Sequence, residues 1–167
     1  ESLADLAARE PEVIVVRLRR NFGKAAALMA GFREARGDAI VTIDGDLQDD
    51  PAEIPRLLAE LEAGADLVSG WKRDRQDPAG KRAASRVFNG VTSRMSGVGL
   101  HDLNCGFKAY RSEVVESLAL TGDQYRYIPV LAAAEGFRVS ELPVNHRPRA
   151  HGRSKYGFER YLRGFLD

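Results

Sequence analysis

The stretch AIVTIDGDLQDDP, residues 39–51, decides the fold, because an apolar run meets two carboxylates and then a helix start. Residues 39–43 form a short apolar run of the kind that becomes a buried strand. Asp44 and Asp46 follow directly, and side chains two residues apart in an extended chain point the same way. Hard divalent cations bind carboxylates, water and phosphate oxygens. The stretch therefore predicts a metal site at the end of a strand.

An ordinary solvated turn is the alternative interpretation of these carboxylates, because acidic residues are common in turns. Two anions alone would repel a bound diphosphate, since unit charges about 4 Å apart interact by roughly 4 kcal/mol near a protein surface. The helix that follows favours a built site. Asp50 is expected as its N-cap, Pro51 as its first residue and Glu53 as the partner in a capping box. Apolar residues at helical spacing follow, and Gly64 is expected to end the helix.

The composition describes one folded domain of 167 residues, with 44% hydrophobic residues and a net charge of +1. Residues 1–80 carry 11 Lys+Arg against 16 Asp+Glu, and residues 81–167 carry 14 against 8. A nucleic-acid binder would have a stronger basic excess. The single cysteine, Cys105, agrees with a reducing compartment. No apolar run of roughly 20 residues and no signal peptide is present, so the chain as given is expected to be soluble.

Strands and helices alternate in the first half of the chain, which indicates a parallel sheet with helices on its faces. The expected elements are a helix ending near Arg9, a strand at 13–18, a helix at 24–35, a strand at 39–43, a helix from Pro51 and a strand at 66–69. In such sheets ligands bind beyond the carboxyl ends of the strands. Asn21, Asp44 and Asp46 fall at this edge.

The pattern changes beyond Gly70. The expected elements are a basic helix at 81–96, a strand at 107–110, a helix from Ser112, a helix at 125–135, strands at 138–142 and 144–147, and an amphipathic segment at 158–166. The apolar stripe of the last segment either packs in a core or lies on a membrane surface.

Four short motifs follow one another along the chain: RNFGK at 20–24, DGDLQDDP at 44–51, DLNCGFKAY at 102–110 and HGRSKY at 151–156. In this order they resemble glycosyltransferase family 2, and within it the polyprenyl-phosphate sugar transferases similar to dolichyl-phosphate mannose synthase. The resemblance covers nearly the whole chain. It implies a GT-A fold, an α/β structure with a mainly parallel central sheet and helices on both faces, as one catalytic domain over residues 1–167.

The resemblance also implies roles for the acidic motifs. Asp44 and Asp46 correspond to the pair that holds Mg²⁺ or Mn²⁺ on a nucleotide sugar, and Gln48 is close enough in sequence to contact phosphate or sugar. Asp102 corresponds to the acceptor-side carboxylate usually proposed as general base. A phosphate monoester is largely dianionic at pH 7, however, so such an acceptor has little need of a base. A positioning role and an ordinary turn residue remain the alternatives for Asp102.

Basic residues suit a phosphate acceptor. Arg86, Arg153 and Lys155 are candidates for neutralising its charge, and the alternative is that they are solvated surface residues. Lys24 and Asn21 are candidates for contacting the nucleotide, although Asn21 also suits a cap of the following helix.

Taken together, the resemblance implies an inverting, metal-dependent glycosyltransferase that moves a sugar from a UDP- or GDP-sugar to a polyprenyl phosphate. The expected location is the cytoplasmic face of the cell membrane. The expected partners are the donor, the acceptor and the membrane surface, with no nucleic acid and with a homo-oligomer left open. The sugar and the nucleotide base are not identified by the motifs.

Two other functions remain open. A sugar-phosphate nucleotidyltransferase would need a glycine-rich triphosphate loop near its start, and none is present. A non-catalytic nucleotide-sugar-binding domain is the second alternative. Family members also carry a Pro-x-Tyr-Asn-Glu type motif on a first strand, and nothing before Val13 matches it. The chain is therefore expected to be a fragment that lacks this strand and any C-terminal membrane segment.

Overall fold

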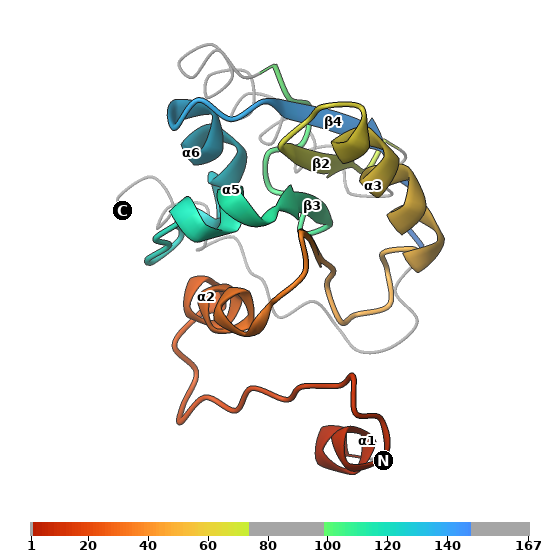
Figure 1. Ribbon diagram of the computed structural model, residues 1–167, viewed down its shortest axis with the longest axis vertical. Helices are drawn as coiled ribbons and strands as arrows, with labels where there is room; N and C mark the ends of the chain where they lie inside the picture. Colours follow the sequence, from red (N-terminus) through yellow and green to blue (C-terminus); the bar gives the residue numbers. More distant parts are fainter. Residues whose placement is uncertain (1, 74–98, 148–167) are drawn as a thin grey trace, which may run out of the picture.

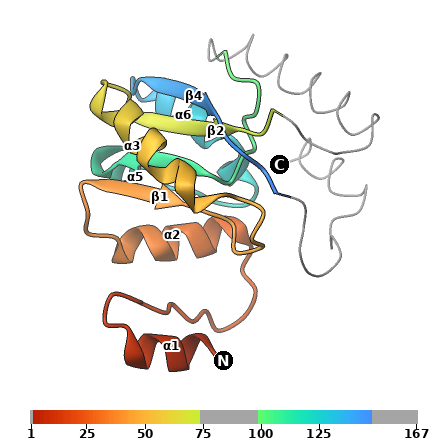
Figure 2. The ribbon, with the colours of Figure 1, turned by 90° about the vertical axis from the view of Figure 1, so that its right-hand side faces the viewer.

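The computed structural model describes residues 2–73 and 99–147. These residues form a mixed four-stranded sheet with helices on both faces (Figures 1 and 2). The elements, with η marking a 3₁₀ helix, are α1 (Leu3–Arg9), α2 (Lys24–Glu34), β1 (Ala39–Thr42), η1 (Pro51–Glu53), α3 (Ile54–Glu62), β2 (Leu67–Trp71), β3 (Lys108–Arg111), α5 (Ser112–Ser117), η2 (Gln124–Arg126), α6 (Ile128–Ala134) and β4 (Val139–Pro143).

The strand order is β1-β3-β2-β4. β2 and β4 are parallel, as the alternation of elements predicted, but β3 runs antiparallel to both β1 and β2. The reason lies in how the chain enters β3: its first residue, Lys108, pairs with Thr42 and Ser69, near the carboxyl ends of β1 and β2. β3 therefore starts at the edge where the other strands end and runs back through the sheet.

Both faces of the sheet are covered, so the strands are apolar on both sides. Leu67 and Tyr110, paired across β2 and β3, pack with residues of α2, α5 and α6. Val68 and Ala109, the next pair, point to the opposite face and pack with Leu57 and other residues of α3. Figure 1 shows α3 and the α5–α6 pair on opposite sides of β2 and β3.

The helix after the acidic loop begins where the sequence predicts. Asp50 is confirmed as a cap, because its side chain accepts a hydrogen bond from the backbone N of Ala52 at 3.1 Å. The capping box is wrong: the buried Glu53 side chain instead accepts from the backbone N of Asn145 at 3.3 Å. Gly64 is confirmed as the stop, since its φ of 115° is one that glycine adopts without strain.

Two predicted strands are wrong. Residues 13–18 form no strand, and their side chains are largely exposed, with Ile14 at 61%. Valine and isoleucine favour a strand only where another strand pairs with it, and no described strand lies beside this segment. Both views place it with α1 apart from the sheet. Residues 144–147 form only an isolated bridge, between His146 and Asp49.

The remaining predicted elements are shifted, divided or not described. The helix expected at 125–135 is divided into η2 and α6, and Pro129 lies in the first turn of α6. Proline favours a helix start at this place, because backbone N–H groups of the first turn have no partner within the helix. The helix expected at 81–96 and the segment at 158–166 lie outside the described residues. Within residues 2–73 and 99–147, no helix has the length and apolar character required to cross a bilayer.

Candidate functional site

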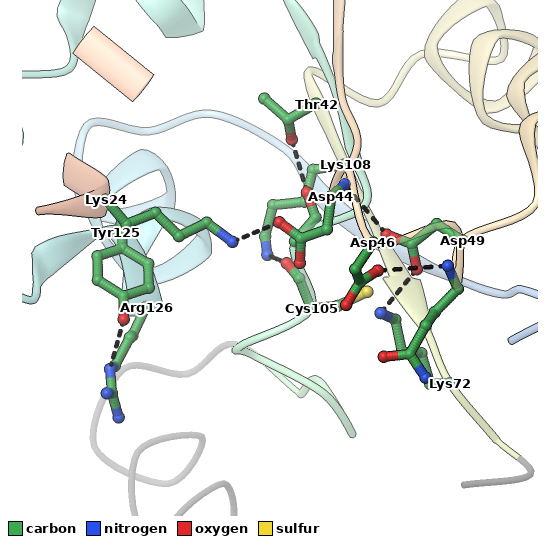
Figure 3. Close-up of polar contacts among 12 residues, drawn as sticks. Lys24, Thr42, Asp44, Asp46, Asp49, Lys72, Cys105, Lys108, Tyr125 and Arg126 are labelled. Carbon is green, nitrogen blue, oxygen red and sulfur yellow. Dashed lines mark hydrogen bonds and ion pairs between the residues drawn. The ribbon is translucent and has the colours of Figure 1, made fainter. Parts of the chain in front are cut away.

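The carboxyl ends of β1, β2 and β4 meet at one edge of the sheet, and the acidic loop after β1 lies there (Figure 3). β1 ends at Thr42, and Gly45 and Asp46 lie in a turn. Asp44 and Asp46 therefore do not lie in an extended strand. The prediction that strand alternation points their side chains the same way is wrong. The turn is held by a hydrogen bond from the backbone N of Gln48 to Asp46 Oδ1 at 3.3 Å.

Asp44 is fixed between a lysine and a glycine. Lys24 Nζ, at the start of α2, lies 2.7 Å from Asp44 Oδ1 and 5.6 Å from the ring centre of Tyr125 (Figure 3). On the other side the carboxylate packs against Gly106, where an added Cβ would lie only 2.5 Å from Asp44 Oδ2. Burial raises the pKa of Asp44, but the bond and charge of Lys24 and the charge of Lys72 outweigh it, so the net pKa is lowered. Asp44 is therefore ionised near neutral pH.

Asp49 is the buried anchor of the loop. Its side chain is inaccessible, and its Oδ1 lies 2.7 Å from Lys72 Nζ, just beyond β2. Its Oδ2 accepts from the backbone N of Asp44 at 3.3 Å. Burial lowers the pKa of Lys72, but the neighbouring acidic groups Cys105, Asp49 and Asp44 outweigh it, so the net pKa is raised. Removing one member of such a pair would leave an uncompensated buried charge.

Gln48 joins the acidic loop to the segment after β4. Its Nε2 donates to the backbone O of Arg147 at 3.3 Å, and the backbone N of Arg147 donates to Gln48 O at 2.7 Å. Arg147 Nη2 also lies 2.8 Å from Asp50 Oδ1. The predicted contact of Gln48 with phosphate or sugar stays a prediction.

Asp102 lies at the same edge of the sheet, on the turn that leads into β3. The residue is 4% exposed. Its backbone N donates to Glu141 Oε1, on β4, at 2.8 Å. Its carboxylate acts on the buried Lys108: burial lowers the pKa of that lysine, and the charge of Asp102 opposes the shift without reversing it. The structure thus brings Asp102 to the edge that carries Asp44 and Asp46.

The other predicted residues divide into two groups. Lys24 contacts the acidic loop, whereas the nearby Asn21 side chain accepts a hydrogen bond from the backbone N of Gly23 at 2.9 Å, which stabilises a local turn. Arg86, Arg153 and Lys155 lie outside the described residues, so their predicted roles remain predictions.

The acidic loop fits a divalent cation that takes part of its ligands from a substrate. Among residues 2–73 and 99–147, no three His, Cys, Asp or Glu side chains are grouped to hold a metal by themselves. A carboxylate has about four acceptor sites, so the hydrogen bond from Gln48 leaves Asp46 able to bind a cation. Asp44, ionised and oriented by Lys24, adds negative charge to the same loop.

Four residues of this edge were missed from the sequence: Asp49, Lys72, Lys108 and Glu141. Lys72 had a usable signal, because it follows β2 as Asp44 follows β1, and both strands end at the ligand-binding edge. Lys108 lies inside the motif at 102–110, but a buried lysine is not evident from a strand pattern. Glu141 gave no signal, since strands commonly alternate apolar and charged residues.

Comparisons with known proteins agree with this picture. The family model described as Glycosyl transferase family 2 matches residues 1–119. The chain is 40% identical over 163 residues to an undecaprenyl-phosphate 4-deoxy-4-formamido-L-arabinose transferase of Edwardsiella ictaluri (strain 93-146), a match that covers 96% of this chain and 50% of that protein. It is 42% identical over 157 residues to a dodecaprenyl-phosphate galacturonate synthase of Rhizobium johnstonii (strain DSM 114642 / LMG 32736 / 3841), with 92% and 46% covered. The chain spans about half the length of these curated relatives.

Solved structures share the fold. A glucosyl-3-phosphoglycerate synthase from Mycobacterium tuberculosis, in complex with phosphoglyceric acid, is 23% identical with a TM-score of 0.61, over 86% of this chain and 51% of that one. The complex of this synthase with Mn²⁺, UDP-glucose and glycerol 3-phosphate is 26% identical with a TM-score of 0.54, over 83% and 50%. These likenesses confirm the predicted GT-A fold.

Proposed function

The chain belongs to glycosyl transferase family 2, and from that premise we propose that it transfers a sugar from a UDP-linked donor to a polyprenyl phosphate. The transfer inverts the configuration at the sugar carbon and depends on Mg²⁺ or Mn²⁺. The whole protein works at the cytoplasmic face of the cell membrane, since a polyprenyl phosphate is a membrane lipid.

The relatives support the acceptor class more strongly than the sugar. The two named above carry different sugars, a formamido-arabinose and a galacturonate, and different lipid lengths, undecaprenyl and dodecaprenyl. Both names share a polyprenyl phosphate. A similar identity to both, 40% and 42%, therefore supports a polyprenyl-phosphate acceptor and leaves the sugar open. The solved structure with Mn²⁺ and UDP-glucose supports a metal and a UDP-linked donor.

One observation carries the proposal: an acidic loop flanked by lysines lies at the carboxyl edge of the sheet. Lys24 Nζ lies 2.7 Å from Asp44, and Lys72 Nζ lies 2.7 Å from Asp49 in the same loop. A divalent cation supplies the charge that neutralises a departing diphosphate. Asp46 is the residue we assign to hold that cation, with Asp44 oriented beside it by Lys24. Lys24 adds a positive charge near the oxygens of the departing diphosphate.

The acceptor needs little chemical activation. Its phosphate is largely dianionic at pH 7, so an oxygen attacks the sugar carbon without giving up a proton. Asp102 is therefore assigned to positioning the acceptor or supporting positive charge on the sugar, rather than to removing a proton. Arg86, Arg153 and Lys155 remain our candidates for binding the acceptor phosphate.

The test uses the intact protein with undecaprenyl phosphate, Mn²⁺ and a panel of UDP- and GDP-sugars. Mass spectrometry of the lipid fraction is expected to find one glycosylated lipid phosphate, with UDP released only when the lipid is present. Formation of a nucleotide sugar from UTP and a sugar 1-phosphate would instead identify a nucleotidyltransferase. Donor binding without any UDP release would identify a non-catalytic binding domain, and either result would contradict the proposal.

A further inference from the structure

One row of side chains crosses all four strands of the sheet. Thr42 of β1 pairs with Lys108 of β3, Lys108 pairs with Ser69 of β2, and Ser69 pairs with Glu141 of β4. Directly paired residues point to the same face of a sheet. The four side chains therefore lie side by side across the sheet, and they are called the cross-strand row below.

The cross-strand row contrasts with the row beside it. Two residues along each strand lies the apolar row Ile40, Tyr110, Leu67 and Val139, and all four pack in the core formed with α2, α5 and α6. The cross-strand row faces the same side but is polar. Ser69 is inaccessible and Lys108 is 2% exposed. Burying polar groups costs free energy unless they are hydrogen-bonded. The hydrogen-bond partners of Ser69 and Lys108 therefore account for polar side chains at these buried positions.

All four side chains bind the backbone of one segment, residues 101–106. On β4, Glu141 accepts from the backbone N of His101 at 3.0 Å and from the backbone N of Asp102 at 2.8 Å. On β2, Ser69 Oγ donates to the backbone O of Asp102 at 3.5 Å. On β3, Lys108 Nζ donates to the backbone O of Leu103 at 3.3 Å and to that of Cys105, and on β1, Thr42 Oγ1 donates to the backbone O of Gly106 at 2.8 Å. The order of contacts along the segment matches the order of strands from β4 to β1. The segment therefore crosses the sheet from β4 to β1.

The two ends of this segment are the two parts of the candidate site. Asp102 lies at its start, above β4 and β2. Gly106 lies at the end of the segment, and the Cα of this glycine packs against the carboxylate of Asp44. The cross-strand row thus holds the five residues of backbone, 102–106, that link Asp102 to the acidic loop.

We propose that Thr42, Lys108, Ser69 and Glu141 act as one positioning row, which holds Asp102 at a fixed place relative to Asp44 for the proposed sugar transfer. The inference rests on the proposed function for its catalytic consequence. These are positioning residues, because each binds the backbone of residues 101–106; Glu141 Oε2 also lies 2.8 Å from Nδ1 of the His101 side chain.

The first test is Glu141→Gln in the intact protein. The variant keeps the size of the side chain but loses its charge and replaces one accepting oxygen with an NH₂ group, which cannot accept from a backbone N–H. We expect kcat to fall about ten- to a hundredfold, the range that corresponds to losing hydrogen bonds to a charged acceptor. Binding of UDP in the presence of Mn²⁺, measured by calorimetry, is expected to stay within about twofold of the unmodified protein. An unchanged kcat would overturn the proposal.

Asp66→Asn provides the matched control. Asp66 also accepts a backbone hydrogen bond across the β2–β4 pair, from the N of Arg138 at 2.8 Å, but at the opposite end of these strands. Its loss disturbs the sheet without touching residues 101–106. We expect its kcat to stay within about twofold of the unmodified protein. A loss as large as that of Glu141→Gln would make the effect a general weakening of the sheet and would overturn the proposal.

A double variant tests whether the row acts as a unit. Thr42 and Glu141 are three strand spacings apart, about 14 Å, and independent sites at such a distance have effects that multiply. Thr42→Val removes the bond to Gly106 while keeping the shape of the side chain. If both residues hold one segment, the double variant loses less kcat than the product of the single losses. Losses that multiply would contradict a single row.

Amide hydrogen exchange separates this inference from the proposed function. Glu141→Gln is expected to speed exchange at the amides of His101 and Asp102 at least tenfold, with no change in Asp66→Asn. This readout needs no turnover, so it stands even if the protein transfers no sugar. If Glu141→Gln does not fold, Ser69→Ala, which removes the longest bond of the row, is measured in the same way. Unchanged exchange in residues 101–106 would overturn the proposal whatever the activity.

Discussion

The contact between Gly106 and Asp44 gives the sharpest prediction. Replacing Gly106 with alanine adds a methyl group 2.5 Å from Asp44 Oδ2, 2.8 Å from its Cγ and 2.9 Å from its Oδ1. Ordinary van der Waals contact begins at 3.4 Å, so the carboxylate oxygen has to move by about 0.9 Å. The shift also disturbs the bond to Lys24, which is 2.7 Å long.

The expected consequence falls on activity first. A misplacement of about 1 Å near a reacting centre can cost about a hundredfold in rate, so we expect Gly106→Ala to lower kcat/KM about ten- to a hundredfold. Overpacking of this kind costs about 1–3 kcal/mol of stability, which a folded protein with a lower melting temperature would reveal. The assay is lipid glycosylation at saturating Mn²⁺, together with thermal unfolding.

Gly31→Ala is the control for this prediction. Gly31 lies within α2, and a Cβ there would meet nothing within 4 Å. The change is expected to leave activity unaltered and to stabilise the helix by up to about 1 kcal/mol. Full activity in Gly106→Ala, with a melting temperature like that of the unmodified protein, would refute the placement of Asp44 against Gly106.

Four further predictions concern single residues. Asp46→Asn is expected to abolish turnover with an unchanged melting temperature, because the neutral amide is a poor cation ligand; full activity would rule out the metal role. Asp102→Asn is expected to lower kcat at least as much as Glu141→Gln but to keep a measurable rate, above that of Asp46→Asn; complete loss would favour base catalysis. The hydrogen bonds of Arg138 lower the pKa of Asp66 from its usual 3.8, so Asp66→Asn should destabilise at pH 7; in urea unfolding this difference should shrink as the pH falls below 3.8 and the native carboxylate protonates, and a difference that does not shrink would contradict the pKa shift. Burial raises the pKa of Cys105, so this thiol should react with an aromatic disulfide reagent only after unfolding; rapid reaction of the native protein would contradict its burial.

Local signals predicted most of the elements and the acidic side of the site. The apolar run before Asp44 became β1, Asp50 capped the next helix, and Gly64 ended it. The end of the motif at 102–110 became β3, close to the strand predicted at 107–110. These predictions succeeded because each depends on residues that are neighbours in the sequence or on a motif with a known place in the fold.

The failures depend on contacts between distant segments. The direction of β3 follows from where the chain re-enters the sheet, which no local pattern records. Residues 13–18 have strand-forming side chains but no described strand beside them. Glu53 turned from its expected cap to Asn145, 92 residues away in sequence. The cross-strand row was missed for the same reason, because pairing between strands is what brings Lys108, Ser69 and Glu141 together.

Binding of a cation by the acidic loop is the premise on which the transfer depends, and diffraction tests it most directly. Crystals of the intact protein soaked with Mn²⁺ and UDP should give an anomalous peak beside the carboxylate of Asp46, in contact with the diphosphate. The same soak of Asp46→Asn should lack the peak. An Mn²⁺ peak and a bound UDP away from the loop at 44–51 would contradict the assignment of this edge as the catalytic site.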